Sequence, residues 1–272
     1  MKSDQVQLHA EIEEKHWWFL GRRKIMRDLV RKVVPASRAA TVVDVGCGTG
    51  ANIAALAEDY SCVGMDASSE AIELARRRFP RVQFLCGSSA GDLGGLARRT
   101  DLFLLMDVLE HVADDASFLS SLVAAMKTGA HLLITVPAGK SLWSQHDVSF
   151  GHLRRYEREQ LQGLWAGLPV SPRLVSYFDT FLYPIVRGLR AIGRLRGRAW
   201  GAAGTDLSLP EWPLNRVLQK IFASEGRFLV DLVEGRRHRG FPFGVSLIAL
   251  LRREPGKVPS DAMNRKDVDR RA

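Results

Sequence analysis

The stretch Thr41–Gly50, T-V-V-D-V-G-C-G-T-G, decides the fold. Its valine-rich residues 42–45 predict a buried strand that breaks into a glycine-rich turn, after which a helix is expected to begin. Gly46, Gly48 and Gly50 let the backbone turn tightly and approach a ligand without Cβ clashes. The N-terminus of the following helix would offer unpaired N–H groups to an anion or a polar ligand.

Two acidic residues add to this pattern. Asp66 ends a second apolar strand, predicted at 61–66, and lies twenty residues after Gly46. An acid at that place can accept hydrogen bonds from the two hydroxyls of a ribose. Asp44 lies in the end of the first strand, two residues ahead of a G-x-G-x-G spacing. Turns that seat a dinucleotide pyrophosphate usually have the spacing G-x-G-x-x-G instead.

The combination resembles motif I of the class I S-adenosylmethionine (SAM) methyltransferases, whose ligand has a ribose but no phosphate. The resemblance spans about 42–137 and implies SAM as the cofactor, bound by a Rossmann-like, doubly wound, seven-stranded α/β sheet. The residues expected to bind SAM are Trp18, Arg22, Arg23, Asp44, Gly46, Cys47, Gly48, Gly50, Asp66, Ala67, Ser88, Ser89, Met106 and Asp107.

Apolar strands and helices alternate along this region, as in a doubly wound parallel sheet. Strands are predicted at 42–45, 61–66, 82–86, 101–106 and 131–137, and helices at 49–58, 69–78 and 112–126. Two further strands, from about Leu174 and at 244–251, are expected to form the antiparallel edge that methyltransferases have. The expected organisation is an N-terminal helical cap (1–40), a SAM-binding core (41–180), an amphipathic helical insertion or lid (181–240), a final edge strand (241–253) and a disordered tail (254–272).

The segment His16–Phe19, followed by Arg22 and Arg23, precedes motif I. Because tryptophan rings are rarely left exposed, we expect them to pack on the glycine-rich turn or on the ligand. H-W-W-F-x-x-R-R resembles the leading helix of many bacterial small-molecule methyltransferases, in which an arginine can pair with the SAM carboxylate. Either arginine could do so here, and a helix that merely attaches to the domain is the alternative. Related enzymes often place an acid against adenine after the third strand, and this chain offers Ser88 and Ser89 instead.

The stretch M-D-V-L-E-H-V, which begins at Met106, is similar to the M-E-x-L-E-H-V of ubiquinone-pathway O-methyltransferases. The similarity implies that Met106 contacts SAM and that Asp107, Glu110 and His111 hold a divalent cation such as Mg²⁺ near the substrate hydroxyl. Residues spaced i, i+3 and i+4 can converge on a metal or a hydroxyl. Alternatively, Glu110 and His111 only orient the helix and the substrate loop.

Residues 141–156, which end in H-D-V-S-F-G-H-L-R-R-Y, follow the fifth strand and are expected to form the acceptor pocket. The pattern H-D-x-x-x-G-H-x-R-R-Y resembles a signature of a large bacterial methyltransferase subgroup. A histidine oriented by a carboxylate can take a proton from an acceptor hydroxyl during methyl transfer, and Asp147 could orient either His146 or His152. Arg154 and Arg155 could bind an acidic group on the acceptor, or Arg155 and Tyr156 could anchor the loop. The candidate catalytic residues are His146, His152, Asp147 and His111.

The net charge of +9 arises entirely in the C-terminal third. Residues 1–180 hold 21 basic and 21 acidic side chains, whereas residues 181–272 hold 18 basic and 9 acidic ones. Such asymmetry indicates an anionic partner or a solvated basic surface. Within 181–240, an apolar stripe is predicted opposite an arginine stripe, which is typical of a helix on an anionic membrane and also of a lid. The stripes are Ile185, Leu189, Ile192 and Leu195, and Arg187, Arg190, Arg194 and Arg198.

Three cysteines, an odd number, predict free thiols in a reducing compartment. The first residues lack the apolar core of a signal peptide. The sequence contains no run of 18 apolar residues, so no membrane-spanning helix is predicted. We therefore expect a cytoplasmic protein, with peripheral binding to the inner face of the membrane as the alternative.

The leading interpretation is transfer of a methyl group from SAM to a small-molecule or lipid-linked acceptor, at oxygen. Nucleic-acid methylation is disfavoured, because the fourth strand ends in M-D-V-L-E-H rather than Asn/Asp-Pro-Pro-aromatic, and no cysteine follows Pro137. A nicotinamide oxidoreductase does not fit the glycine spacing. A non-catalytic, membrane-associated scaffold with the same fold is the remaining alternative, and the intact motif I argues against it.

Overall fold

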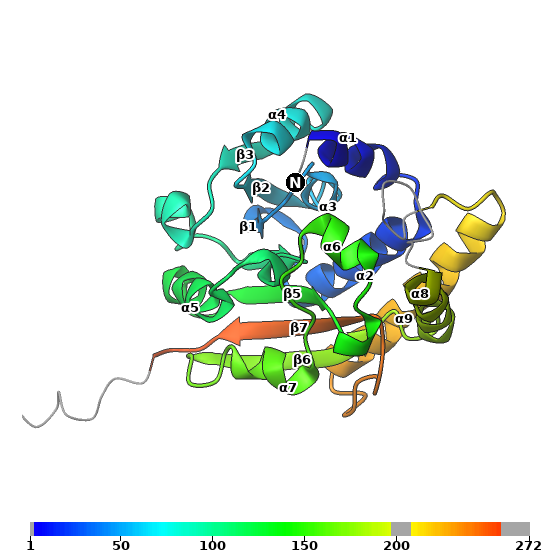
Figure 1. The fold of residues 1–272 in the computed structure, drawn as a ribbon. Helices are drawn as coiled ribbons and strands as arrows, with labels where there is room; N and C mark the ends of the chain where they lie inside the picture. Colours follow the sequence, from blue (N-terminus) through cyan, green and yellow to red (C-terminus); the bar gives the residue numbers. More distant parts are fainter. Residues whose placement is uncertain (1–2, 197–207, 257–272) are drawn as a thin grey trace, which may run out of the picture.

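The structure is a computed structural model that describes residues 3–196 and 208–256. Seven strands form one sheet in the order β3-β2-β1-β4-β5-β7-β6 (Figure 1). Strands β1 to β5 are parallel, and β7 runs antiparallel to both β5 and β6. The strands are β1 (Ser37–Val45), β2 (Tyr60–Asp66), β3 (Gln83–Cys86), β4 (Leu102–Met106), β5 (His131–Pro137), β6 (Val170–Phe178) and β7 (Ser246–Arg253).

Helices cover both faces of the sheet, which explains why the central strands are apolar on both sides. One core contains side chains of α2, α3, α4 and α9, and the other contains side chains of η1, α5 and α7. The α-helices are α1 (Ser3–Ile12), α2 (Trp17–Val33), α3 (Ala51–Ala54), α4 (Ser69–Arg78), α5 (Asp115–Ala125), α6 (Gln145–Phe150), α7 (Arg158–Gly163), α8 (Tyr183–Arg196) and α9 (Leu214–Val233). The 3₁₀ turns are η1 (Ala90–Leu96), η2 (Leu109–His111) and η3 (Lys140–Leu142).

The predicted seven-stranded α/β fold is confirmed, and two helices differ from their predicted bounds. The helix predicted at 49–58 ends at Ala54, because i→i+3 bonds such as that from Leu56 N to Ile53 O tighten the chain before β2. The helix predicted at 112–126 begins only at Asp115, after the separate turn η2. The predicted tail from residue 254 falls largely outside the described residues.

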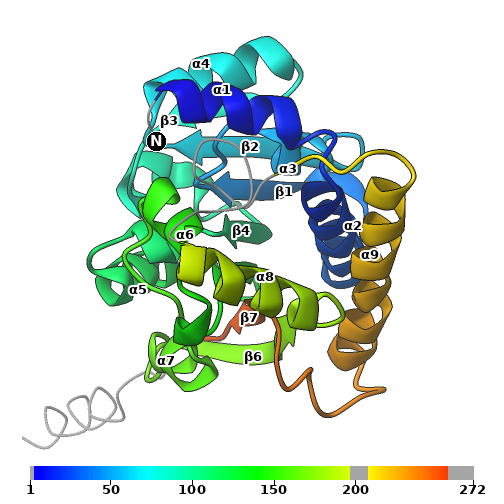
Figure 2. The same ribbon diagram turned by 45° about the vertical axis from the view of Figure 1, so that its right-hand side comes forward.

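Helix α9 packs along α2 and contributes to the main core (Figure 2). The buried ring of Phe222 stacks on Phe178 at a centroid distance of 5.8 Å and meets the edge of Trp17 at 6.0 Å. A Cβ at Gly21 would lie 2.6 Å from the Phe222 ring, so glycine is what allows α2 and α9 to approach. The second half of the predicted insertion is therefore fixed to the first helices of the chain.

Helix α8 has its predicted stripes, but their placement is unusual. Ile185, Leu189 and Ile192 are exposed, whereas Arg190 on another side of the helix is buried. The side chains of Arg194, Leu195 and Arg198 lie outside the described part of the chain. Among the helices that the structure describes, none is both long and apolar enough to cross a bilayer.

Candidate active site

A cavity of about 710 Å³ opens at the carboxyl ends of the parallel strands, where ligands bind in doubly wound sheets. The turns after β1, β2, β3 and β4 line it, and so do α1, α2, α6, α8 and the segment that leads into α9. Of the predicted site residues, those in its wall are Trp18, Arg22, Gly46, Cys47, Gly48, Asp66, Ala67, Ser88, Met106, Asp107, Glu110, His111, His146 and His152. Those that do not line it are Arg23, Asp44, Gly50, Ser89 and Asp147.

The glycine-rich turn is held against the end of β2. The backbone amides of Gly46 and Cys47 donate to the carbonyl of Met65 at 2.7 and 3.0 Å. Asp66 Oδ2 accepts a hydrogen bond from Gly48 N at 2.8 Å. Gly48 has φ +53°, and a Cβ there would meet no atom within 4 Å, so the backbone at this point borders open cavity. The predicted turn thus presents bare backbone and a carboxylate to a ligand.

The turn after β3 is held in place by Asp92. Its Oδ2 accepts hydrogen bonds from Ser88 N, Ser89 N and Ser89 Oγ, each at 2.9 Å. These bonds, led by that from Ser88 N, lower the pKa of Asp92 and keep it ionised. Ser88 faces the cavity, whereas the hydroxyl of Ser89 is used within the turn.

Arg22, not Arg23, faces the cavity. Its guanidinium lies 4.3 Å from the centroid of the Trp18 ring and forms an ion pair with Asp107. Burial lowers the pKa of Arg22 to about 10, which leaves it charged at neutral pH. Arg23 instead donates to the carbonyl of Glu13 at 2.9 Å and so links α2 to α1.

Asp44 lies beneath this pair and is completely buried. Neither of its carboxylate oxygens has a hydrogen-bond partner among the described residues. Burial raises the pKa of Asp44 to about 7, against the opposing effect of the Arg22 charge. Asp44 can therefore gain or lose a proton near neutral pH.

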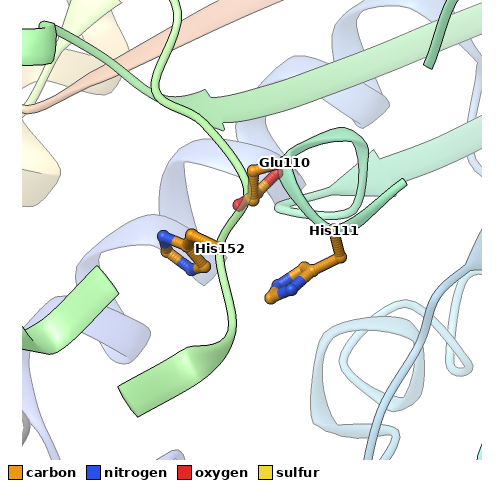
Figure 3. Close-up of side chains that lie close together, drawn as sticks. All are labelled: Glu110, His111 and His152. Carbon is orange, nitrogen blue, oxygen red and sulfur yellow. The ribbon is translucent and has the colours of Figure 1, made fainter. Parts of the chain in front are cut away.

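The fold does not bring together the three predicted metal ligands, Asp107, Glu110 and His111, as one group. Asp107 has φ 57°, pairs with Arg22 through Oδ2 and accepts from Thr135 Oγ1 through Oδ1 at 3.0 Å. The described group that could hold a metal ion is Glu110, His111 and His152, whose ligand atoms lie within 4.8 Å of one another (Figure 3). His152 takes the place of Asp107 because the loop after α6 closes on η2, where Leu153 N donates to Glu110 O at 2.8 Å.

Two members of this cluster, Glu110 and His111, favour their neutral forms. Glu110 is completely buried with neither carboxylate oxygen bonded among the described residues, and burial raises its pKa to about 8. Burial, together with the nearby His152, lowers the pKa of His111 to about 4. The rings of His111 and His152 meet edge to face at 4.9 Å. Neutral imidazoles keep a lone pair that can accept a proton or bind a metal.

Asp147 orients His152. Its Oδ1 accepts from His152 Nδ1 at 2.9 Å and from Arg155 Nε at 2.8 Å, and its Oδ2 accepts from Ser144 N at 2.9 Å. The last bond is half of the capping box that starts α6. Because Nδ1 faces the carboxylate, Nε2 is the His152 nitrogen that can accept a proton from a ligand.

The charges around Asp147 keep it ionised. Burial alone would raise its pKa, but the hydrogen bond from His152 and the charges of Arg155 and Arg190 lower it overall. Arg190 comes from α8, lies 3.9 Å from Asp147 Oδ2 and donates to the carbonyl of Leu142 at 3.0 Å. Burial, followed by the Arg190 charge, lowers the pKa of His146 to about 3.

The two arginines after His152 anchor the loop. Arg154 lies 2.6 Å from Asp115 Oδ2, to which the Tyr156 hydroxyl also donates at 2.6 Å. Arg155, besides holding Asp147, donates to the carbonyl of Ala138 at 2.8 Å. The anchoring alternative is therefore the one that the contacts support.

Several residues in or near the cavity wall were not predicted from the sequence. Asp179 follows β6 with φ 56°, and burial, reinforced by Glu225, raises its pKa to about 8. Its signal was an acid directly after a strand, which resembles the position of Asp66 at the end of β2. Glu225 of α9 accepts from Thr180 N and Phe181 N at 2.7 and 2.9 Å.

Helix α1 is attached to the glycine-rich turn through Glu13, which also lines the cavity. Glu13 Oε1 accepts from Thr49 Oγ1 at 2.5 Å and pairs with Arg78. His16 caps α2 by accepting from Trp18 N, and its Nε2 lies 3.0 Å from the carbonyl of Ser208. No local sequence signal indicates partners this far apart.

A family model described as a methyltransferase domain matches residues 19–181, more than half of the chain. The chain belongs to the class I SAM-dependent methyltransferase family. Its seven-stranded sheet with an antiparallel edge is the fold expected for this family from the sequence.

Curated relatives match the chain only in part. A trans-aconitate 2-methyltransferase of Azoarcus sp. is 35% identical over 121 residues, which cover 43% of this chain and 46% of that protein. A ubiquinone biosynthesis O-methyltransferase of Coxiella burnetii is 33% identical over 98 residues, covering 35% of this chain and 42% of that protein. The chain thus spans less than half the length of these relatives.

Solved structures share the fold. A putative methyltransferase solved with the Haloferax volcanii Trm112 activator aligns with a TM-score of 0.57 at 16% identity, covering 93% of this chain and 95% of that one. The plantazolicin methyltransferase BamL, solved with S-adenosylhomocysteine, aligns with a TM-score of 0.55 at 13% identity, covering 93% of this chain and 91% of that one.

Proposed function

We propose that the protein transfers the methyl group of SAM to a hydroxyl oxygen of an uncharged, largely apolar acceptor. The observation that carries the proposal is His152 in the wall of the methyltransferase cavity, paired with the buried Asp147 at 2.9 Å between Nδ1 and Oδ1. SAM, when bound, supplies an activated methyl group on a sulfonium. The protein then has to align the acceptor, exclude water and remove one proton.

The walls near β1 and β2 fit SAM. Asp66 lines the cavity and is assigned to the ribose hydroxyls, and Gly48 lets the backbone approach without a Cβ. Arg22 offers a guanidinium to a carboxylate, with the Trp18 ring behind it. Met106 and Ser88 complete the wall on either side.

His152 is the residue placed to take the hydroxyl proton. The ionised Asp147 holds Nδ1–H and stabilises the imidazolium that forms when Nε2 accepts the proton. His111 and Glu110 lie beside His152 and can hold the hydroxyl oxygen in line, because their neutral forms exchange hydrogen bonds without charge repulsion. His146 stays neutral and lines the same wall.

The charges of the cavity favour an uncharged acceptor. Arg22 is paired with Asp107, and its remaining N–H groups are assigned to the SAM carboxylate. Arg155 and Arg190 both point toward Asp147, so an acceptor carboxylate would have to displace one of these two pairs. Apolar side chains line the remaining wall, which suits a prenyl-like or lipid-linked body: Phe118, Phe150, Leu182, Ile185, Val186 and Leu189. The free cysteines support a reducing compartment such as the cytoplasm.

Glu110, His111 and His152 also form a donor set that fits a divalent cation, since two imidazoles and a carboxylate suit Zn²⁺, Fe²⁺ or Mn²⁺ better than Mg²⁺. Such an ion would lower the pKa of a bound hydroxyl, and His152 would then be a ligand rather than a base. Activity that survives a chelator supports the base. Activity that is lost and then restored by one of these ions supports the metal.

The testing experiment measures transfer of labelled methyl from SAM to a panel of uncharged phenols, prenols and quinols, with carboxylic acids as the comparison. In His152→Gln and Asp147→Asn we expect kcat to fall by about 100-fold or more while SAM affinity stays unchanged. His238→Gln, a change at an exposed histidine outside the cavity, is the matched control. Full turnover in His152→Gln, or a preference for the carboxylic acids, would refute the proposal.

A further inference from the structure

Exposed apolar side chains are concentrated in one part of the molecule. Of the twelve large apolar side chains that are exposed in the described chain, ten lie between residues 181 and 243. Eight of them lie on α8 or on α9 and the segment before it, and we call them the α8–α9 apolar surface: Ile185, Leu189, Ile192, Leu209, Trp212, Leu214, Val217 and Ile221. Soluble proteins rarely expose so many neighbouring apolar groups without a partner for them.

The contacts of helix α8 explain why its apolar side chains remain exposed. Burying the apolar stripe and exposing the arginines would be the ordinary arrangement of an amphipathic helix. Here Arg190 faces inward because Asp147 and the carbonyl of Leu142 receive it. The stripe formed by Ile185 and its neighbours is left outside, with Ile185 58% exposed.

The surface is continuous with the mouth of the cavity. Ile185 and Leu189 are exposed and also line the cavity, so they form its rim. Pro210 and Leu218, which border the other apolar residues along the chain, line the same cavity. An apolar molecule could therefore pass from the surface into the cavity without crossing a polar barrier at these residues.

Exposed cations flank the apolar residues. They take part in no ion pair within residues 3–196 and 208–256. Among the described residues of α8, of α9 and of the segment before α9, the single exposed acid is Glu211. A symmetric contact between two copies of the chain would bring these like charges together, which disfavours a dimer. The cations are Arg187, Arg216, Lys220 and Arg227.

We propose that the α8–α9 apolar surface docks on an anionic lipid bilayer, from which the acceptor enters the cavity past the rim. Apolar groups would enter the bilayer interface, and the flanking cations would meet anionic headgroups. The docking itself stands on the surface alone, whereas the delivery of an acceptor rests on the proposed function.

The base of this surface is rigid. Asn215 accepts from Trp17 N at 2.9 Å and donates to the carbonyl of Lys15 at 2.8 Å. Phe222 and Leu229 bury the opposite side of α9 in the core. Deleting 181–240 would therefore damage the core, and point changes on the exposed side of α9 are the sharper test.

The test is co-sedimentation with vesicles of phosphatidylcholine alone and of phosphatidylcholine with about a third phosphatidylglycerol, a fraction chosen to resemble an anionic leaflet. We expect binding to the anionic vesicles, weakened at high salt. Leu214→Ser/Val217→Ser and Arg216→Glu/Lys220→Glu should each weaken it about tenfold or more. Arg81→Glu/Arg98→Glu, the same charge change at exposed sites elsewhere, should leave it nearly unchanged.

The outcomes separate the two proposals. SAM titration of every variant checks that the fold is intact. Absence of vesicle binding by the unaltered protein, equal binding by all variants, or a dimer that Leu214→Ser/Val217→Ser dissociates would each overturn the docking proposal. Vesicle binding without methyl transfer to any hydroxyl would leave docking standing and remove the proposed function instead.

Discussion

Two walls of one cavity are built in different ways. The cofactor wall consists of the turns after β1, β2 and β3, and its carboxylates bond to backbone amides on the same or the adjacent strand end, as Asp66 does with Gly48 and Ser68. The acceptor wall consists of α6, the loop to residue 156, α8 and residues 208–218. Its contacts join distant segments, such as Arg190 to Leu142, 48 residues away.

The difference indicates which wall determines cofactor affinity and which determines turnover. In the cofactor wall, a strand, a turn and a helix place the lining groups almost by themselves. In the acceptor wall, a group gains its role only when another segment packs against it. Substitutions in the two walls should therefore separate cofactor affinity from turnover.

The largest effect is expected for Asp66→Ala in the cofactor wall. The change removes the acceptor of the Gly48 and Ser68 amides and the carboxylate that we propose binds the ribose. The loss of two charge-assisted hydrogen bonds from the ribose hydroxyls, at about 1.5–3 kcal/mol each, should lower the SAM affinity at least about 100-fold. Calorimetric titration measures this affinity. Glu58→Ala, at an exposed acid before the start of β2, is the control. Unchanged affinity in Asp66→Ala would show that this wall does not bind the ribose.

Much of the cofactor wall could be predicted from the sequence. Strand β5 and helix α4 have the predicted bounds, and Asp66 lies where the spacing placed it. The physical reason is that glycine at positive φ, an acid at a strand end and a serine cap act within a few residues. Each of these signals comes from residues that are close together in the sequence.

The acceptor wall could be predicted only in part. The sequence marked Asp147 and both loop histidines, but it could not choose between His146 and His152, because the choice depends on how the loop closes on η2. Helical periodicity gave the two stripes of α8 but not which side faces inward. That orientation follows from Arg190 meeting a carboxylate on another element.

A second test compares the two adjacent arginines of α2. Arg22→Ala removes the guanidinium in the cavity and leaves Asp107 without its ion pair, so we expect SAM affinity to fall about tenfold or more. Arg23→Ala removes only the bond to the Glu13 carbonyl and should leave the affinity within about twofold. Equal losses in both variants would mean that α2 acts through the position of α1 rather than through Arg22.

In the acceptor wall, Arg190→Met tests whether α8 supports the Asp147–His152 pair. We expect kcat to fall about tenfold with SAM affinity unchanged, because the carboxylate loses a nearby cation while the buried volume is kept. Proton uptake by the pair becomes easier without that cation, so the acidic limb of the pH–rate profile should move to higher pH. Arg190→Lys should recover much of the rate. A lower rate with an unshifted profile would indicate a packing role only.

The smallest expected effect concerns stability and contrasts Asp179, a buried acid that lines the cavity after β6, with Asp92, an exposed acid beside the cofactor wall. Burial raises the pKa of Asp179 to about 8. In the unfolded chain an aspartate ionises near pH 4, so between about pH 4 and 8 the folded state binds the extra proton and stability falls as pH rises. Asp179→Asn cannot ionise, and asparagine tolerates the positive φ at this position.

Thermal unfolding at pH 6 and pH 9 measures this contribution. Asp179→Asn should lose less stability than the unaltered protein between the two pH values, by a few degrees in Tm, since each kcal/mol corresponds to about 2–4 °C for a chain of this size. Asp92→Asn is the counterpart, because hydrogen bonds lower the pKa of Asp92 and keep it ionised at both pH values. It should lower Tm equally at pH 6 and pH 9. Parallel pH curves for Asp179→Asn and the unaltered protein would mean that Asp179 is already ionised in the folded state, and that Arg190 rather than burial governs its proton.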